Sequence, residues 1–465
     1  MLSKFGEKFT DLFQKYMPNA FVFALLLTII TAIIAMVWLN NSPMEVIKGW
    51  YSGFFDLLAF GMQIVLIIIT GFSIALSPTI RKVIDKLTQY ICSPNQVYLF
   101  VVFIGALLCL VSFGWVVITC VLARELALRV NGVNYPFLIA CVYFSSGSWV
   151  CGLSSSIPLL LNTEQNYLIE AGILSEVIPT SFTLGSLLNI TMLILILVVA
   201  PLLVLLIAPK NNKGKELKDL LGDFYSVKDI SIKEEAYNYK LPVKAVSDSL
   251  NNSFIIQLII VAMGFSYSIY HFYENGFDLN FNIMIFIFLM IGMLLHKTPM
   301  RYGIAMRRAS TNVSGVLYQY PFYAGIMGLM IYSGLGTELA QIFASVATID
   351  NFPFFAYLTG GAVNFAIPSA GGEFAVIGPS IIEAVKELGV GLPDDQVTAM
   401  ISRASLSVAY GESLSNMMQP FFLLLVLPIM GAGVKLQARD IMGYLVVPFI
   451  IFFIIQSLMV LYVPL

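Results

Sequence analysis

Long apolar runs alternate with short polar stretches along the whole chain. A helix needs about 20 apolar residues to cross the roughly 30 Å hydrocarbon core of a bilayer. The composition agrees with this pattern, because 58% of the residues are hydrophobic and 11% are charged, whereas soluble domains carry about 25% charged residues. We therefore predict an all-α polytopic membrane protein. Its spans are expected at residues 20–39, 54–76, 136–161, 182–208, 253–270, 279–295, 312–334, 400–430 and 441–463.

Lysine and arginine in the polar stretches set the predicted orientation, because short cytoplasmic loops are enriched in both. Residues 1–18 carry three lysines and apolar residues at helical spacing, which predicts an interfacial amphipathic helix. The stretch 77–96 and the loop 209–252, with its eight lysines, are also basic. Loop 162–181 and segment 335–352 contain no lysine or arginine. We expect the basic segments and the N-terminus in the cytoplasm, and the other two segments and the C-terminus outside.

Two apolar segments do not fit as single crossings. Residues 97–123 have basic residues on both sides, and residues 353–387 have acidic residues on both sides. We therefore predict two re-entrant hairpins, one entering from the cytoplasm with its tip at 112–115 and one entering from outside with its turn at 368–372. Non-helical backbone at membrane depth is tolerated only where protein covers it or where it lines a cavity. Both hairpins are therefore candidate site elements.

The second half of the chain repeats features of the first. Gln63 follows Met44 of a Ser-Pro-Met motif by 19 residues, and Gln319 follows Met300 of a Thr-Pro-Met motif by 19 residues. Each half then carries a hairpin and a span broken by small and polar residues. Paired broken helices in an inverted repeat are typical of secondary transporters with a binding site at the membrane midplane.

These patterns predict two inverted-topology repeats, at residues 19–208 and 279–465. A cytoplasmic loop at 209–252 and a linker transmembrane helix at 253–270 separate them. The odd linker crossing is what inverts the second repeat. A channel is a weaker alternative, because it would not need paired inverted hairpins.

The broken segments supply candidate substrate ligands. Free N–H groups at helix N-termini bind carboxylates without any lysine or arginine. Glycine allows close approach of the backbone, and proline interrupts the helix. The same small residues could instead serve helix packing, which stays an open alternative. The predicted substrate-binding residues are Ser112, Phe113, Gly114, Ser154, Ser155, Ser156, Asn364, Pro368, Ser369, Gly371, Gly372, Ser415 and Asn416.

Two acids in the apolar segments are candidates for ion coupling, namely Glu373 and Glu412. Intramembrane carboxylates are costly and mark ion or proton pathways. No lysine or arginine falls at the predicted midplane, so a small monoanion is favoured over a dicarboxylate. An ionised Glu373 would repel that anion at low dielectric. We therefore expect H⁺ as the coupling ion, with Na⁺ as the runner-up.

Several function classes are excluded. The chain lacks the HExxH, GxSxG and P-loop motifs, and it has only two histidines. The five cysteines have no metal-ligand spacing. The net charge of −2 gives no sign of nucleic-acid binding. We expect no enzyme, no metal and no cofactor.

The chain resembles the bacterial short-chain fatty acid transporter family from about residue 10 to 460. Segments that carry the resemblance include FVFALLLTIITAIIAM at 21–36, LLHKTPMRY at 294–302, NFAIPSAGG at 364–372 and AYGESLSNMMQPF at 409–421. The resemblance implies uptake of acids such as acetoacetate or butyrate across the bacterial cytoplasmic membrane. Through the wider ion transporter superfamily, it implies a homodimer, a mobile transport domain beside a scaffold, and elevator-type alternating access.

The chain departs from the family pattern at the proposed site. It has Ser112-Phe113-Gly114 where Asn-Trp-Gly is typical, and Glu373-Phe374 where His-Trp is typical. Both differences bear on the substrate range and on the coupling ion.

Overall fold

The computed structural model describes residues 2–56, 58–87, 89–163, 166–210, 212, 214–222, 231–243, 245–276, 281–311 and 313–465. Every regular element assigned within them is a helix, which confirms the predicted all-α class.

The helices of the first half are α1 (Leu2–Tyr16), α2 (Ala20–Trp38), α3 (Pro43–Asp56), α4 (Leu58–Ala75), α5 (Pro78–Leu87), α6 (Pro94–Val111), η1 (Phe113–Trp115), α7 (Val116–Arg129), α8 (Tyr135–Ser146), η2 (Gly147–Cys151), α9 (Ser156–Leu161), α10 (Tyr167–Glu170), η3 (Thr180–Phe182), α11 (Leu187–Ile194), η4 (Leu195–Val199) and α12 (Ala200–Ile207). The loop and linker contain α13 (Leu217–Leu221), α14 (Ile232–Asn238), α15 (Val246–Asn251) and α16 (Phe254–Asn275).

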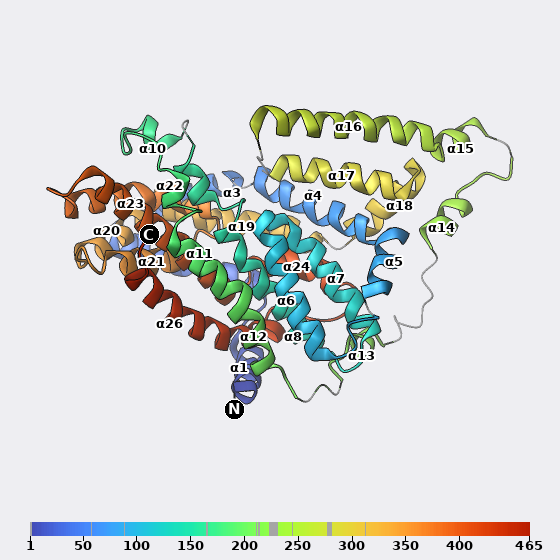
Figure 1. Ribbon diagram of the computed structural model, residues 1–465, viewed down its shortest axis with the longest axis horizontal. Coiled ribbons are helices and arrows are strands. Elements are labelled where there is room, and N and C mark those ends of the chain that lie inside the picture. Colours follow the sequence, from blue (N-terminus) through green and yellow to red (C-terminus); the bar gives the residue numbers. More distant parts are fainter. Residues whose placement is uncertain are drawn as a thin grey trace.

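The helices of the second half are α17 (Phe281–His296), α18 (Pro299–Ser310), α19 (Ser314–Tyr332), α20 (Leu335–Ser345), α21 (Phe352–Val363), α22 (Ala370–Leu388), α23 (Asp394–Ser415), η6 (Asn416–Met418), α24 (Leu423–Met430), α25 (Arg439–Met442), η7 (Gly443–Leu445) and α26 (Val446–Tyr462). Figure 1 shows α16, α17 and α4 side by side along one edge, and α1 near α12 at the opposite edge.

Several helices are long and apolar enough to cross a membrane. Within the described residues there are six of them, or up to eight if each bent pair forms one span. One bent pair turns by 59° between α19 and α20, and the other turns by 45° between α23 and α24. The six are Ala20–Trp38, Pro94–Val111, Tyr135–Leu161, Leu187–Ile207, Val246–Asn275 and Arg439–Tyr462.

The predicted hairpins correspond to two interrupted helix pairs. In the first pair, α6 ends at Val111 and α7 begins at Val116. In the second pair, α21 ends at Val363 and α22 begins at Ala370. The helix α6 is long enough to cross the membrane alone, so the re-entrant path of 97–123 stays a prediction. The domain boundaries and the membrane-surface position of α1 also stay predictions.

Several helices lie wholly or mostly outside the predicted spans, and three of them pack against the bundle. These are α3, α5 and α20, of 14, 10 and 11 residues. A search for apolar runs of about 20 residues passes over them, because each is too short to span the bilayer. The helix α3 packs along α19, and α20 packs against α21 and α22.

Glycines let α21 and α23 pack with their backbones in contact. A Cβ atom at Gly360 would lie 2.3 Å from the Val408 carbonyl oxygen, and one at Gly411 would lie 1.9 Å from the Tyr357 carbonyl oxygen. Small residues at helix crossings allow this close approach inside membranes. The crossing fixes the end of α21 beside the end of α23, where both helices break.

Replacing Gly360 should separate the two helices. Gly360→Ala is expected to lower the free energy of unfolding by about 1–3 kcal/mol, because the added methyl group overpacks the crossing. The control is Gly361→Ala on the same helix, where the new Cβ would make an ordinary contact of 3.4 Å to the Gly411 oxygen. Thermal unfolding of both purified variants in detergent measures the difference. Equal melting temperatures would contradict this packing.

Candidate functional site

The interruptions predicted from the sequence meet inside the bundle. The Phe113 amide donates to Ser154 Oγ at 2.9 Å, which joins the first break to the second. Ser413 Oγ donates to the Gly147 carbonyl oxygen at 3.0 Å, which joins the end of α23 to the second break. Both halves of the chain therefore contribute to one region. The breaks lie at 112–115, 147–155, 364–369 and 416–422.

The fully buried side chain of Asn364 joins the third break to the fourth. Its Nδ2 atom donates to Ser415 Oγ and Asn416 Oδ1, each at 2.7 Å, and to the Glu412 carbonyl oxygen at 3.0 Å. An amide nitrogen carries two hydrogens, so one of these bonds is shared. Asn364 therefore acts as a positioning residue that holds the end of α23 against the α21–α22 break.

Two residues outside the predicted set extend this network. Gln419 Nε2 donates to Asn416 Oδ1 at 2.8 Å and to the Asn364 carbonyl oxygen at 3.3 Å. The Tyr143 hydroxyl donates to the Asn416 carbonyl oxygen at 2.5 Å. Gln419 lies in the broken segment 409–421 and could have been found there, whereas Tyr143 lies in an apolar run that gives no local signal.

A cavity of about 70 Å³ opens between the breaks. Its aromatic wall forms around Phe113, whose ring centroid lies 5.8 Å from that of Trp149 and 5.4 Å from that of Phe422. Trp149, Ala370 and Phe422 were not predicted, because apolar residues in apolar runs do not stand out. The cavity is lined by Phe113, Trp149, Ser154, Ser156, Pro368, Ser369, Ala370, Gly371, Glu412 and Phe422.

Other predicted residues lie beside this cavity without lining it. Ser112 ends α6, with its amide bonded to the Leu108 carbonyl oxygen. Gly114 packs so tightly that a Cβ there would lie 2.1 Å from Ile67 Cδ1. Asn416 lines a smaller cavity of about 30 Å³. The cavity of about 70 Å³ is likewise not lined by Ser155, Asn364, Gly372, Glu373 or Ser415.

The N-terminus of α22 faces the cavity of about 70 Å³ through Ala370 and Gly371. Ser369 is the N-cap residue but makes no side-chain capping bond. The first helical bond runs from the Glu373 amide to the Ser369 carbonyl oxygen, at 2.7 Å. The preceding N–H groups have no intrahelical acceptor and carry partial positive charge. The arrangement can bind an anion through backbone groups alone.

Two buried acids, Glu412 and Glu373, lie at the cavity and in the first turn of α22. Glu412 lines the cavity and is 1% exposed, and Glu373 in the first turn of α22 is 0% exposed. Among the described residues, no carboxylate oxygen of either acid has a partner with hydrogen-bond geometry. The Asn416 side chain lies beside Glu412, and the two acids would repel each other if both were ionised. A buried charge without a partner is costly. The pair is therefore suited to holding a proton or a cation.

Comparisons with known proteins match almost the whole chain. The short chain fatty acid transporter family matches residues 1–463. A protein of Escherichia coli strain K12, named as a candidate short-chain fatty acid transporter, is 37% identical over 448 residues, 96% of each chain. A protein of Haemophilus influenzae with the same name is 35% identical over 451 residues, also 96% of each chain. The solved YdaH transporter of Alcanivorax borkumensis aligns over 97% of both chains with 14% identity and a TM-score of 0.42.

Removing the Asn364 side chain should loosen the site. Asn364→Ala is expected to lower the free energy of unfolding by about 1–3 kcal/mol, because buried acceptors on α23 lose their donor. Asn275→Ala, at an exposed position on α16, is the control. Melting temperatures in detergent compare the two. A melting temperature of Asn364→Ala equal to that of the unsubstituted protein would refute the positioning role.

Proposed function

Because the chain belongs to the short chain fatty acid transporter family, we propose that it transports short-chain monocarboxylates and binds them in the cavity between the breaks. The observation that carries the proposal is the uncapped N-terminus of α22 at this cavity. Helix N-termini bind carboxylates through backbone N–H groups. Among the described residues, no lysine or arginine lines the cavity, so the site suits one negative charge better than two.

The size and lining of the cavity favour a small acid. Its volume of about 70 Å³ is roughly half the 150 Å³ of an engineered cavity that admits benzene. A ligand of about four heavy atoms, such as acetate, fits this volume by the same comparison. The rings of Phe113, Trp149 and Phe422 give an alkyl chain an apolar surround. Longer acids require these rings to move.

Glu412 favours proton-coupled symport, with Na⁺ as the alternative coupling ion. If Glu412 were ionised, it would repel the substrate carboxylate in a region where no described cation offsets the repulsion. A proton on Glu412 removes that repulsion and adds a hydrogen-bond donor. Substrate binding would then draw a proton into the site. Glu373 is the second candidate, because it is buried and would repel an ionised Glu412 unless one of the two carried a proton.

The transport path belongs to the same proposal. Two inverted repeats are supported by matched packing, since α6 contacts α8 as α21 contacts α23. Ser42 and Thr298 also match: each side chain accepts a backbone N–H from the helix that begins at the following proline. We extend the proposal to both re-entrant hairpins, a homodimer and elevator-type movement in the cytoplasmic membrane, as the family resemblance implies.

Replacing Glu412 should uncouple transport from protons. Glu412→Gln is expected to abolish accumulation driven by a pH gradient in proteoliposomes and to leave counterflow of labelled acetate largely intact, because the amide keeps a donor but does not ionise. Glu387→Gln, at an exposed position on α22, should retain accumulation. Accumulation by the unsubstituted protein that follows a Na⁺ gradient and ignores the pH gradient would overturn proton coupling.

Replacing Phe422 should change chain-length preference. Phe422→Ala enlarges the cavity, so uptake of butyrate relative to acetate should rise by about tenfold or more, the effect of one or two methylene groups in an apolar pocket. Phe449→Ala, which removes a ring stacked on Phe453 away from the cavity, is the control. Labelled-acid uptake in proteoliposomes gives the ratios. An unchanged ratio, or exchange of succinate as fast as acetate, would contradict the proposed site.

A further inference from the structure

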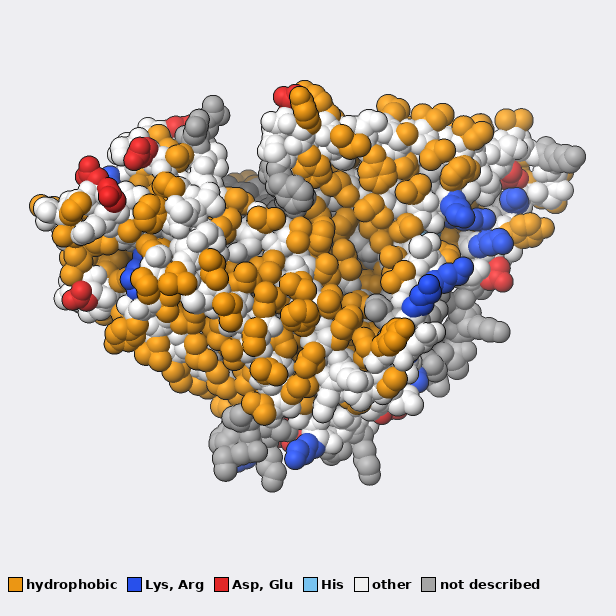
Figure 2. All heavy atoms as spheres, in the orientation of Figure 1, with side chains coloured by type: hydrophobic (Ala, Val, Ile, Leu, Met, Phe, Trp, Pro, Cys, Tyr) orange, Lys and Arg blue, Asp and Glu red, His pale blue; other side chains and the backbone are white. Residues whose placement is uncertain are grey.

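A larger cavity lies apart from the breaks and has five lysine and arginine residues in its lining. It measures about 510 Å³ and is formed by α5, the start of α14, the end of α17 and the start of α18. Figure 2 shows lysine and arginine side chains gathered over this end of the molecule. We name it the basic cleft. Its described cationic residues are Lys82, Lys86, Lys233, Lys297 and Arg301.

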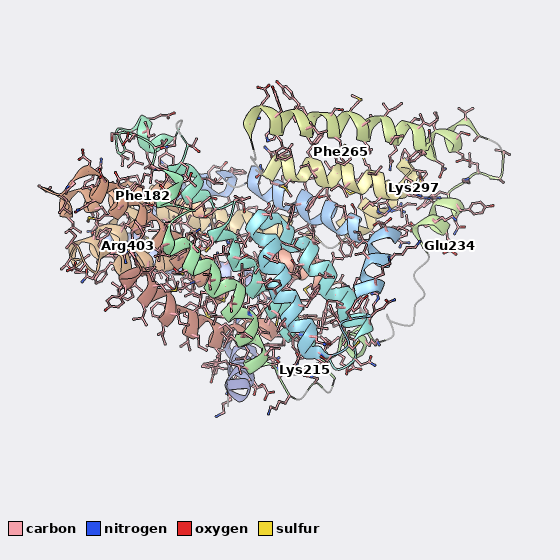
Figure 3. All side chains as sticks on the ribbon, in the orientation of Figure 1. Phe182, Lys215, Glu234, Phe265, Lys297 and Arg403 are labelled. Carbon is pink, nitrogen blue, oxygen red and sulfur yellow. The ribbon has the colours of Figure 1, made fainter. Side chains whose placement is uncertain are left out.

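Among the residues whose side chains the structure describes, no acid lines the basic cleft. None of its five cations forms an ion pair with any of those residues. The two acids of α14 are already engaged: Glu235 accepts from Arg307 at 2.6 Å and from Arg308 at 2.9 Å, and Glu234 accepts from the Ser231 amide at 3.0 Å. Figure 3 shows Glu234 and Lys297 at this same end of the molecule. The positive potential of the cleft therefore favours binding of an anion.

The N-termini of two helices add to the positive potential of the basic cleft. The ten-residue α5 begins at Pro78, which lines the cleft. The twelve-residue α18 begins at Pro299, with Arg301 in its first turn. Both helices therefore direct the positive ends of their dipoles toward the cleft, where a phosphate group is stabilised.

The remaining lining identifies the class of ligand. Apolar side chains lie among the cations, namely Pro78, Val83, Ile232 and Leu295. The cleft also adjoins the end of α17, an apolar helix. A soluble phosphate needs no apolar wall, whereas a lipid places its phosphate beside acyl chains. We infer that the basic cleft binds the phosphodiester headgroup of an anionic phospholipid.

The position of the cleft predicts that a bound lipid stabilises the protein. Its walls belong to α14 of the loop 209–252 and to α5, α17 and α18 of the bundle. A bound headgroup would tie the loop to the bundle through charges on both. The melting temperature would then depend on the anionic lipid content of the membrane, independently of which acid is transported.

The test compares lipids and two matched variants. Lys82→Gln with Lys297→Gln removes two exposed charges from the cleft, and Lys48→Gln with Lys435→Gln removes two exposed charges elsewhere. Native mass spectrometry of the purified full chain, titrated with phosphatidylglycerol or phosphatidylcholine, measures binding. Each lysine contributes about fivefold to binding of anionic lipid, so the cleft variant should bind phosphatidylglycerol about 30-fold more weakly. The control variant should bind like the unsubstituted protein.

Phosphatidylglycerol should also raise the melting temperature of the unsubstituted protein and of the control, but not that of the cleft variant. Equal phosphatidylglycerol binding by both variants would overturn the proposal. Equal binding of phosphatidylcholine and phosphatidylglycerol by the unsubstituted protein would overturn it too. Complete displacement of the lipid by about 10 mM inorganic phosphate, at the affinity of a soluble anion, would show that the site takes a free phosphate instead.

Discussion

The buried amide of Asn364 is the contact on which the arrangement of the breaks depends. A helix interrupted inside an apolar bundle leaves peptide groups without their usual partners, and each is costly unless another group satisfies it. Asn364 donates to three acceptors at the end of α23, and Gln419 returns a bond to the Asn364 carbonyl oxygen. The two interruptions in the second half of the chain are thus joined by side-chain hydrogen bonds that run in both directions. Their separation would leave the buried Asn364 amide without the three acceptors to which it donates.

The long helices can be predicted from the sequence, whereas the shorter helices and the contacts between helices cannot. Apolar runs of spanning length predict α2, α16 and α26, since a bilayer requires that length. Shorter helices such as α3 and α20 are not predicted by this pattern, because they are too short to span the bilayer and are stabilised by packing against other helices. The glycine contact of Gly360 with Val408 is similarly hidden. A glycine in an apolar run gives no indication of which backbone will approach it.

The site was predictable where polar residues interrupt apolar helices. Ser154, Pro368 and Glu412 stand out in the sequence and line one cavity. Asn364 also stands out, but its hydrogen bonds direct it toward α23. Trp149 and Phe422 could not be identified, since an aromatic side chain is ordinary in such a run. Polarity therefore locates the breaks, and only the fold separates the residues that line the cavity from those that position them.

The cavity between the breaks takes residues from both halves, with Ser154 and Ser156 from the first and Pro368 and Glu412 from the second. Neither half can hold a complete site alone. A protein of half this length would have to pair with a second copy to rebuild the site, and the two sides would then be identical. In a single chain the two halves can differ in sequence, so the two sides of the cavity need not be identical. The second half can specialise in an acid and a helix N-terminus while the first supplies the Ser154 and Ser156 hydroxyl groups and the rings of Phe113 and Trp149.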